Sequence, residues 1–117
     1  MILADDLTGA MDTGVQIYGR GQRVTVCIDP VYAGELSADA DLLVADSESR
    51  NATRADAERI VNEMLRIAAR HGLSLVYKKI DSTLRGNVGA EIDAVFDSRT
   101  AEAILVAPAL PHNGRTT

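Results

Sequence analysis

Short apolar runs alternate along the chain with longer segments of helical spacing. Runs that are apolar or β-branched over most of their length predict strands, and their lack of polar alternation indicates strands buried on both faces. We expect strands at residues 2–4, 22–28, 42–45, 74–80 and 103–107. The first of these reads as the end of a strand. Residues 31–41 carry no clear period and are predicted to be a loop with at most one helical turn.

Helices are predicted at residues 9–20, 53–71 and 88–96, with Thr53 as the N-cap of the second. Each shows apolar side chains at helical spacing, which we expect to face the core. In order along the chain these are Met11, Val15 and Tyr18, then Ile60, Val61, Met64, Leu65 and Ala68, then Val88, Ile92, Val95 and Phe96.

Strands that alternate with helices predict an α/β fold, here a three-layer sandwich around a mostly parallel sheet. Right-handed crossovers would bring every loop that follows a strand to one edge of that sheet. Polar sequence follows four of the expected strands, at residues 5–9, 46–50, 79–87 and 112–115. Ligands of open α/β sheets bind outside the carboxyl ends of the strands. A site formed by these βα loops is therefore expected, although the strand order is not fixed by the pattern.

The most concentrated polar stretch is residues 78–87, K-K-I-D-S-T-L-R-G-N, between an expected strand and an expected helix. Backbone N–H groups and the helix dipole favour an anion at such a junction. Lys78, Lys79 and Arg85 add positive charge, which predicts an anion-binding site rather than a surface loop with scattered charges.

Asp5, Asp6 and Asp12 form an acidic set near the start of the first helix, with Thr8 beside them. Clustered carboxylates can bind Mg²⁺, act as a general base or accept hydrogen bonds from a polyol. Aspartate is also favoured at helix caps and in first turns, so a purely structural role remains open.

Arg50, Arg85 and Arg115 each lie at or near the end of a polar loop. A guanidinium binds carboxylate or phosphate in a bidentate fork, so a shared acid ligand would account for all three. Asn113 and Gly114 indicate a turn first and a ligand contact second.

Composition narrows the classes of function. The chain has 117 residues, enough for one domain, with 12 basic and 17 acidic residues, a net charge of −5 and 3% aromatic residues. The absence of a basic stripe argues against nucleic acid as a partner. No apolar run has membrane-spanning length and no signal peptide is apparent, so a cytoplasmic protein is expected.

Three further observations limit the chemistry. Cys27, the single cysteine, lies in an apolar run and is expected to be buried and inert. His71 and His112 have no companions at metal-ligand spacing, so no metal site is predicted. Neither G-x-x-x-x-G-K-[ST] nor G-x-G-x-x-G occurs. If the protein uses ATP, the nucleotide site should lie outside these residues.

Residues 4–14 (A-D-D-L-T-G-A-M-D-T-G), 78–91 and 108–117 resemble the N-terminal domain of the four-carbon acid sugar kinase family. Residues 46–50, D-S-E-S-R, resemble that family's D-T-E-S-R loop, with Ser47 where threonine is commoner. The resemblance implies ATP-dependent phosphorylation of the terminal hydroxyl of erythronate, threonate or a 3-oxo-tetronate. It also implies that the N-terminal domain holds the sugar acid, whereas ATP and Mg²⁺ bind mainly in a separate C-terminal domain.

The resemblance suggests a role for each candidate residue. Arg85 and Arg115, with Lys79, would bind the substrate carboxylate or the transferred phosphoryl group, and Asp5 or Asp6 would act as base. The catalytic set is then Asp5, Asp6 and Arg85. The substrate-binding set is Thr8, Asp12, Arg50, Lys79, Asp81, Ser82, Asn87, Asn113, Gly114 and Arg115.

Under this interpretation residues 1–117 are a truncated N-terminal acid-sugar-binding domain, from which the C-terminal nucleotide-binding domain is absent. The fragment alone would be inactive, and an exposed strand edge could promote assembly into a homo-oligomer. Two alternatives remain. One is a non-catalytic acid-sugar-binding module. The other is a haloacid-dehalogenase-like phosphatase, although Asp5 and Asp6 are adjacent rather than two residues apart.

Overall fold

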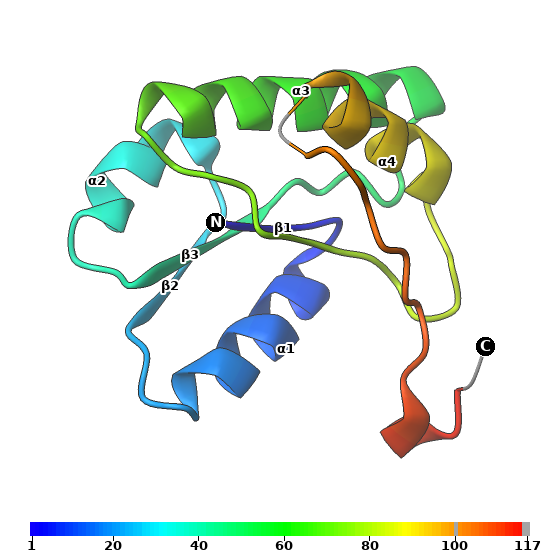
Figure 1. Cartoon of the computed structure of the whole chain (residues 1–117), viewed down its shortest axis with the longest axis horizontal. Helices are drawn as coiled ribbons and strands as arrows, with labels where there is room; N and C mark the ends of the chain where they lie inside the picture. The colour runs from blue at the N-terminus through cyan, green and yellow to red at the C-terminus, as the bar shows by residue number, and fades with distance from the viewer. Residues whose placement is uncertain (100, 116–117) are drawn as a thin grey trace.

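The computed structural model describes residues 1–99 and 101–115, whose strands form one parallel sheet (Figure 1). Its order is β2-β3-β1-β4. The strands are β1 (Ile2–Ala4), β2 (Val24–Cys27), β3 (Leu42–Asp46) and β4 (Tyr77–Lys79). The helices are α1 (Leu7–Tyr18), α2 (Ala33–Ser37), α3 (Arg54–Arg70) and α4 (Val88–Asp97), with short 3₁₀ turns η1 (Pro30–Tyr32) and η2 (Pro111–Asn113).

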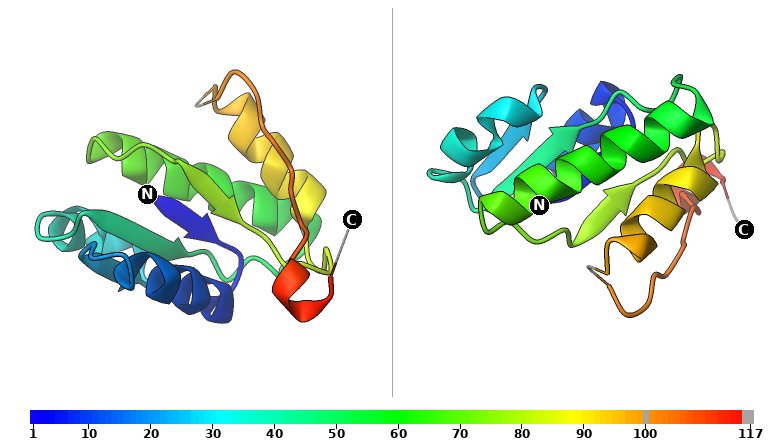
Figure 2. Two further views of the ribbon diagram at one scale, coloured as in Figure 1. Left: turned by 60° about the horizontal axis from the view of Figure 1, so that its bottom comes forward. Right: turned by 90° about the horizontal axis from the view of Figure 1, so that it is seen from above.

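The helices cover both faces of the sheet, which confirms the predicted three-layer α/β fold. α1 lies on one face, and α2, α3 and α4 lie on the other (Figures 1 and 2). The larger core cluster includes Leu3, Leu43, Val61 and Leu65, which are all buried. Most of the predicted apolar stripe of α3 is therefore in the core, and Thr53 caps this helix as expected.

The register of the sheet aligns the carboxyl ends of its central strands. Ala4 of β1 is paired with Asp46 of β3 on one side and with Lys79 of β4 on the other. The loops that follow these three strands therefore start at the same level of one edge, as expected for a parallel sheet.

Helix α1 packs on the sheet through small residues, and the prediction that Met11, Val15 and Tyr18 face the core was wrong. These three are 49%, 61% and 69% exposed, whereas Ala10 and Gly14 are buried. A Cβ on Gly14 would lie 3.4 Å from Val26 Cγ2. The helix approaches the sheet so closely that larger side chains fit only on its outer face.

Helix α4 also differs from expectation, because Phe96 is 54% exposed while Glu91 is buried. Ala90, Ala94 and Val95 complete the buried face. A charged residue thus occupies an inward position because it has a buried lysine partner, described below.

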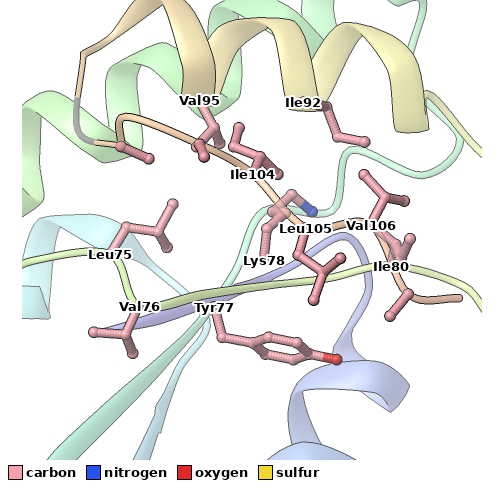
Figure 3. A pocket seen from close by; sticks show the side chains of 13 residues that line it. Leu75, Val76, Tyr77, Lys78, Ile80, Ile92, Val95, Ile104, Leu105 and Val106 are labelled. Carbon is pink, nitrogen blue, oxygen red and sulfur yellow. The ribbon is translucent and has the colours of Figure 1, made fainter.

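The predicted strand at residues 103–107 was wrong. This segment runs beside β4 but forms no ladder with it within the described chain, and Leu105 is 92% exposed. An apolar cavity of about 400 Å³ lies between the two and is lined by Leu75, Tyr77, Ile104 and Val106, among others (Figure 3). High strand propensity does not by itself give a segment a hydrogen-bonding partner. Here side chains lie between the backbone of residues 103–107 and that of β4.

Across residues 1–99 and 101–115, none of the helices combines the length and hydropathy needed to span a bilayer.

Candidate functional site

The polar loops meet at the carboxyl ends of β1 and β4, which are neighbours in the sheet. The chain leaves β1 for α1 on one face and leaves β4 towards α4 on the other (Figure 2). Adjacent parallel strands whose connections diverge in this way define a topological switch point, where open α/β sheets bind ligands. The cavity lined by β4 and residues 101–107 has a volume of about 400 Å³. Its walls are mainly apolar, and it is not formed by the polar loops.

Arg50 joins the loops that follow β3 and β1. Its Nε donates to Asp5 Oδ2 at 2.9 Å and its Nη2 donates to Asp5 Oδ1 at 2.8 Å, while Nη1 donates to Asp6 Oδ2. Asp5 is 1% exposed, so both of its oxygens are committed inside the protein. The pKa of Arg50 is raised, chiefly by its hydrogen bonds to Asp5.

Asp6 keeps part of its carboxylate accessible, with 22% of its side chain exposed. Its Oδ1 accepts a hydrogen bond from Gly9 N at 2.8 Å, so Asp6 is the N-cap of α1. Gly9 allows close approach, because a Cβ there would lie 2.9 Å from Asp6 Oδ1 and 3.4 Å from Lys79 Cγ. Lys79 Nζ donates to Ile80 O at 2.7 Å. The structure therefore brings Asp6 and Lys79 together across Gly9.

Asp81 and Arg85 form an ion pair within the loop that follows β4. Asp81 is buried and accepts from Arg85 Nε at 2.9 Å and from Arg85 Nη2 at 2.8 Å. The Arg85 guanidinium holds the pKa of Asp81 well below its usual range. The charges of Asp6 and Asp5 add to the effect of Asp81 in raising the pKa of Arg85. Arg85, with 68% of its side chain exposed, thus lies within electrostatic reach of the acidic pair and remains open to a ligand.

The C-terminal loop reaches the same loop through Arg115, whose Nη1 donates to Ser82 Oγ. Gly114 adopts a left-handed conformation at φ 67°, and Leu110 and Arg115 form an isolated antiparallel bridge. Asn113 is exposed in the turn η2. The side chain of His112 lies outside the described part of the structure.

Three residues that were predicted to bind the ligand are placed differently from Asp6, Lys79 and Arg85. Asn87 Nδ2 donates to Ser49 O at 3.0 Å and to Ala52 O at 2.9 Å, so its amide binds backbone. Thr8 is exposed in the first turn of α1. A helix that began at residue 9, as predicted, would have Asp12 in its first turn, but α1 begins at Leu7 and places Asp12 in its second turn, exposed.

Sequence reasoning missed a buried polar chain behind Arg50. Lys78 Nζ lies 2.6 Å from Glu91 Oε2, and Ser49 Oγ donates to Glu91 Oε1 at 2.5 Å. Ser49 Oγ is 2.7 Å from Ser47 Oγ and can accept its proton, while Ser47 N donates to the carbonyl of Ala4 at 2.9 Å. The signal in the sequence was a glutamate at an inward position of an otherwise apolar helix face.

Asp46, at the end of β3, is a second buried carboxyl that was not predicted. It is 2% exposed, and its Oδ2 finds no hydrogen-bond partner among the described residues. Burial raises the pKa of Asp46, and the charges of Glu48 and Asp6 act in the same direction. Asp46 is therefore stabilised in its protonated form within this edge of the sheet.

Asp6 thus presents a partly exposed carboxylate near Lys79 and within electrostatic reach of the exposed Arg85 guanidinium. Such a set can bind the carboxylate of a small acid and accept a hydrogen bond from one of its hydroxyls. The fold and this edge define an α/β ligand-binding domain whose site is built from βα loops.

Comparison with known proteins agrees with this class. The family described as "Sugar-binding N-terminal domain" matches residues 1–117. The chain is 40% identical to a D-threonate kinase of Salmonella typhimurium over all of its own length and 27% of the relative's. It is 37% identical to a D-erythronate kinase of Heliobacterium modesticaldum, again over all of its length and 27% of the relative's.

A solved structure from Bordetella bronchiseptica supports the fold. It superimposes with a TM-score of 0.79 at 37% sequence identity, over 88% of this chain and 26% of that one. That protein was crystallised with bound citrate as a domain-swapped dimer. The present chain belongs to the sugar-binding N-terminal domains of the four-carbon acid sugar kinase family. It spans about a quarter of the length of the curated relatives that it matches.

Proposed function

We propose that this chain is the substrate-binding part of an ATP-dependent kinase that phosphorylates a four-carbon sugar acid at its terminal hydroxyl. The observation that carries the proposal is that the exposed Arg85 guanidinium lies within electrostatic reach of the partly exposed Asp6 carboxylate, on loops that leave the adjacent carboxyl ends of β4 and β1. A tetronate presents one carboxylate and several hydroxyls, which match these two groups. The relatives that act on threonate and erythronate support this class of substrate without distinguishing between its members.

Within the proposed site, Arg85, Arg115 and Lys79 supply positive charge for the substrate carboxylate or the transferred phosphoryl group. Asp6 accepts a hydrogen bond from a substrate hydroxyl and is better placed than Asp5 to act as base. Asp5 is buried, with both oxygens bound to Arg50, so its role is to orient Arg50 and, through it, Asp6. Phosphoryl transfer depends mainly on such positioning and charge stabilisation.

ATP would be bound by parts of the longer protein outside this chain. The sequence contains neither common phosphate-binding loop. The described residues also contain no cluster of three or more potential metal ligands. No step of the reaction is therefore assigned to Mg²⁺ within this chain.

The position of Asp5 also bears on the two alternative functions, a phosphatase and a non-catalytic binding module. A phosphatase that uses Asp5 as nucleophile is disfavoured, because an attacking oxygen must be accessible and unpaired. A non-catalytic acid-sugar-binding module would use the same loops. It differs from the kinase proposal in requiring no nucleotide-binding partner.

The proposal can be tested by isothermal titration calorimetry of the chain with D-threonate, D-erythronate and ATP at low salt. We expect heat from at least one sugar acid, none from ATP, and loss of the sugar-acid signal in Arg85→Gln. Arg66→Gln, on the exposed surface of α3, is the matched charge control and should bind as the parent does. ATP binding without sugar-acid binding, or equal binding by Arg85→Gln and the parent, would contradict the proposal.

A further inference from the structure

A buried polar chain links β4, α4 and the loop that carries Arg50. The side chains of Lys78 and Glu91 are 9% and 1% exposed, and their charged atoms are 2.6 Å apart. Ion pairs this deeply buried rarely add stability over apolar residues of similar volume. Stability alone therefore does not account for the pair.

The second oxygen of Glu91 supplies an explanation, because it binds the residue adjacent to Arg50. Ser49 is fully buried, and its hydroxyl donates to Glu91 Oε1 at 2.5 Å. The backbone of Arg50 is then fixed on its other side, where its N–H donates to Asp5 O at 3.0 Å. The Arg50 guanidinium is thus aimed at Asp5 and Asp6 from a loop held by Glu91.

The far end of this network of polar side chains reaches strand β1. The hydroxyl of Ser47 lies 2.7 Å from that of Ser49 and 2.7 Å from the carbonyl of Ala4, and its single proton can go to the Ser49 oxygen because Ser47 N already donates to Ala4 O at 2.9 Å. Ala4 directly precedes Asp5. The network therefore contacts the polypeptide on both sides of the Asp5–Arg50 pair.

We infer that Glu91, held by Lys78, is a positioning residue for the sugar-acid site, acting through Ser49 on the Arg50 loop. The inference rests on the proposed function for its ligand, but its structural part concerns Arg50 alone. The side-chain partners of Glu91 among the described residues are Lys78 and Ser49, so its effect reaches Asp6 through Arg50.

A variant that removes both charges tests whether the Lys78–Glu91 pair positions Arg50 or only stabilises the fold. Lys78→Met/Glu91→Leu replaces the ion pair with apolar residues of similar volume, so we expect the urea midpoint of the parent to be retained. The Arg50 Nε–H signal in ¹⁵N NMR, which reports the ion pair with Asp5, should nevertheless shift and exchange faster with water. The affinity for a sugar acid should fall about tenfold, the change expected when one well-placed hydrogen bond is lost.

Ser49→Ala provides a second test should the double variant fail to fold, because it removes the link and leaves the ion pair intact. It should produce the same change in the Arg50 Nε–H signal. Asp93→Asn is the matched control, since this carboxylate lies on the same helix and its side chain is 66% exposed. It should leave the Arg50 signal unchanged.

The Arg50 signal needs no ligand, so it distinguishes failure of this inference from failure of the proposed function. A parent-like Arg50 signal in Ser49→Ala, or in a folded Lys78→Met/Glu91→Leu variant, would overturn the positioning role. A shifted signal in a chain that binds no sugar acid would support the positioning of Arg50 and contradict only the proposed ligand.

Discussion

The guanidinium of Arg50 donates to both carboxylate oxygens of Asp5, a residue 45 positions earlier in the chain, at 2.9 and 2.8 Å. A third contact of the same guanidinium, from Nη1 to Asp6, holds the partly exposed carboxylate of that residue, which is the proposed ligand contact. The site therefore depends on Arg50 for its shape more than for its charge.

Arg50→Met should destabilise the domain strongly. The change leaves the Asp5 carboxylate, 1% exposed, without its cation, and such losses cost about 3–5 kcal/mol. Urea unfolding monitored by circular dichroism measures the effect. Arg54→Met, whose side chain is 78% exposed, should change the free energy of unfolding by less than about 0.5 kcal/mol. Similar losses in the two variants would mean that the Asp5–Arg50 pair is not structural.

Gly86→Ala should also disturb Arg50. Gly86 has φ +89°, and a Cβ there would lie 3.1 Å from Arg50 Cγ and 3.2 Å from Arg50 O. Backbone strain of this kind costs about 1–3 kcal/mol. Gly89→Ala is the matched control, because a Cβ at this helical position meets no atom within 4 Å among the described residues.

The control should stabilise the domain by about 0.5–1 kcal/mol, since alanine favours helix over glycine. Thermal unfolding of both variants checks the pair. Opposite signs are expected, and a stabilising Gly86→Ala would contradict the close contact with Arg50.

Two substitutions of Asp6 separate its structural and ligand-binding roles. Asp6→Asn keeps an oxygen that can accept from Gly9 N, whereas Asp6→Ala loses the cap of α1 and about 1 kcal/mol of stability. If the carboxylate binds a substrate hydroxyl, both variants should lose affinity for sugar acids. Calorimetry combined with urea unfolding tests this. Parent-like affinity in Asp6→Asn would assign Asp6 to the cap alone.

Asp46→Asn should stabilise the domain at neutral pH. Burial raises the pKa of Asp46 above its ordinary value of 3.8, so the folded state favours the protonated form. Stability from this group is present at acid pH and is lost as the pH rises through the folded-state pKa. Asparagine removes that loss, so we expect a higher free energy of unfolding than that of the parent near pH 7. Urea midpoints over a range of pH should converge below the ordinary pKa; a less stable variant at neutral pH would contradict this account.

The sequence was sufficient to predict β1 to β4 and the three longer helices in their order. It also predicted a strand at residues 103–107 that does not form, and residues 31–41 were predicted to be a loop with at most one helical turn where α2 lies. The apolar runs at β1 and β3 are buried over almost their whole length, and most of the apolar stripe of α3 is buried, as the sequence pattern predicts. The loops that meet at the edge also followed from the parallel arrangement. Arg50, Arg85 and Asp6 could be selected because their loops follow strands in the sequence.

Features set by tertiary contacts could not be predicted in this way. Gly14 within the first predicted helix does indicate close packing on the sheet, and this is confirmed, but the apolar spacing of Met11, Val15 and Tyr18 does not show that these side chains lie on the exposed face of α1. Glu91 is buried because Lys78 and Ser49 surround it, and these residues come from other parts of the chain. Residues 103–107 have strand propensity, but pairing requires a backbone partner at hydrogen-bond distance.

In the proposed function, the loops at the adjacent carboxyl ends of β1 and β4 bind a four-carbon sugar acid. The most direct test is a ¹⁵N–¹H NMR titration of the chain with D-threonate and D-erythronate. We expect amide shifts in residues 6–9 and 79–86, in these loops, with small changes along α3. Shifts concentrated instead in residues 101–107, beside the apolar cavity, or no shifts at millimolar ligand would contradict the claim.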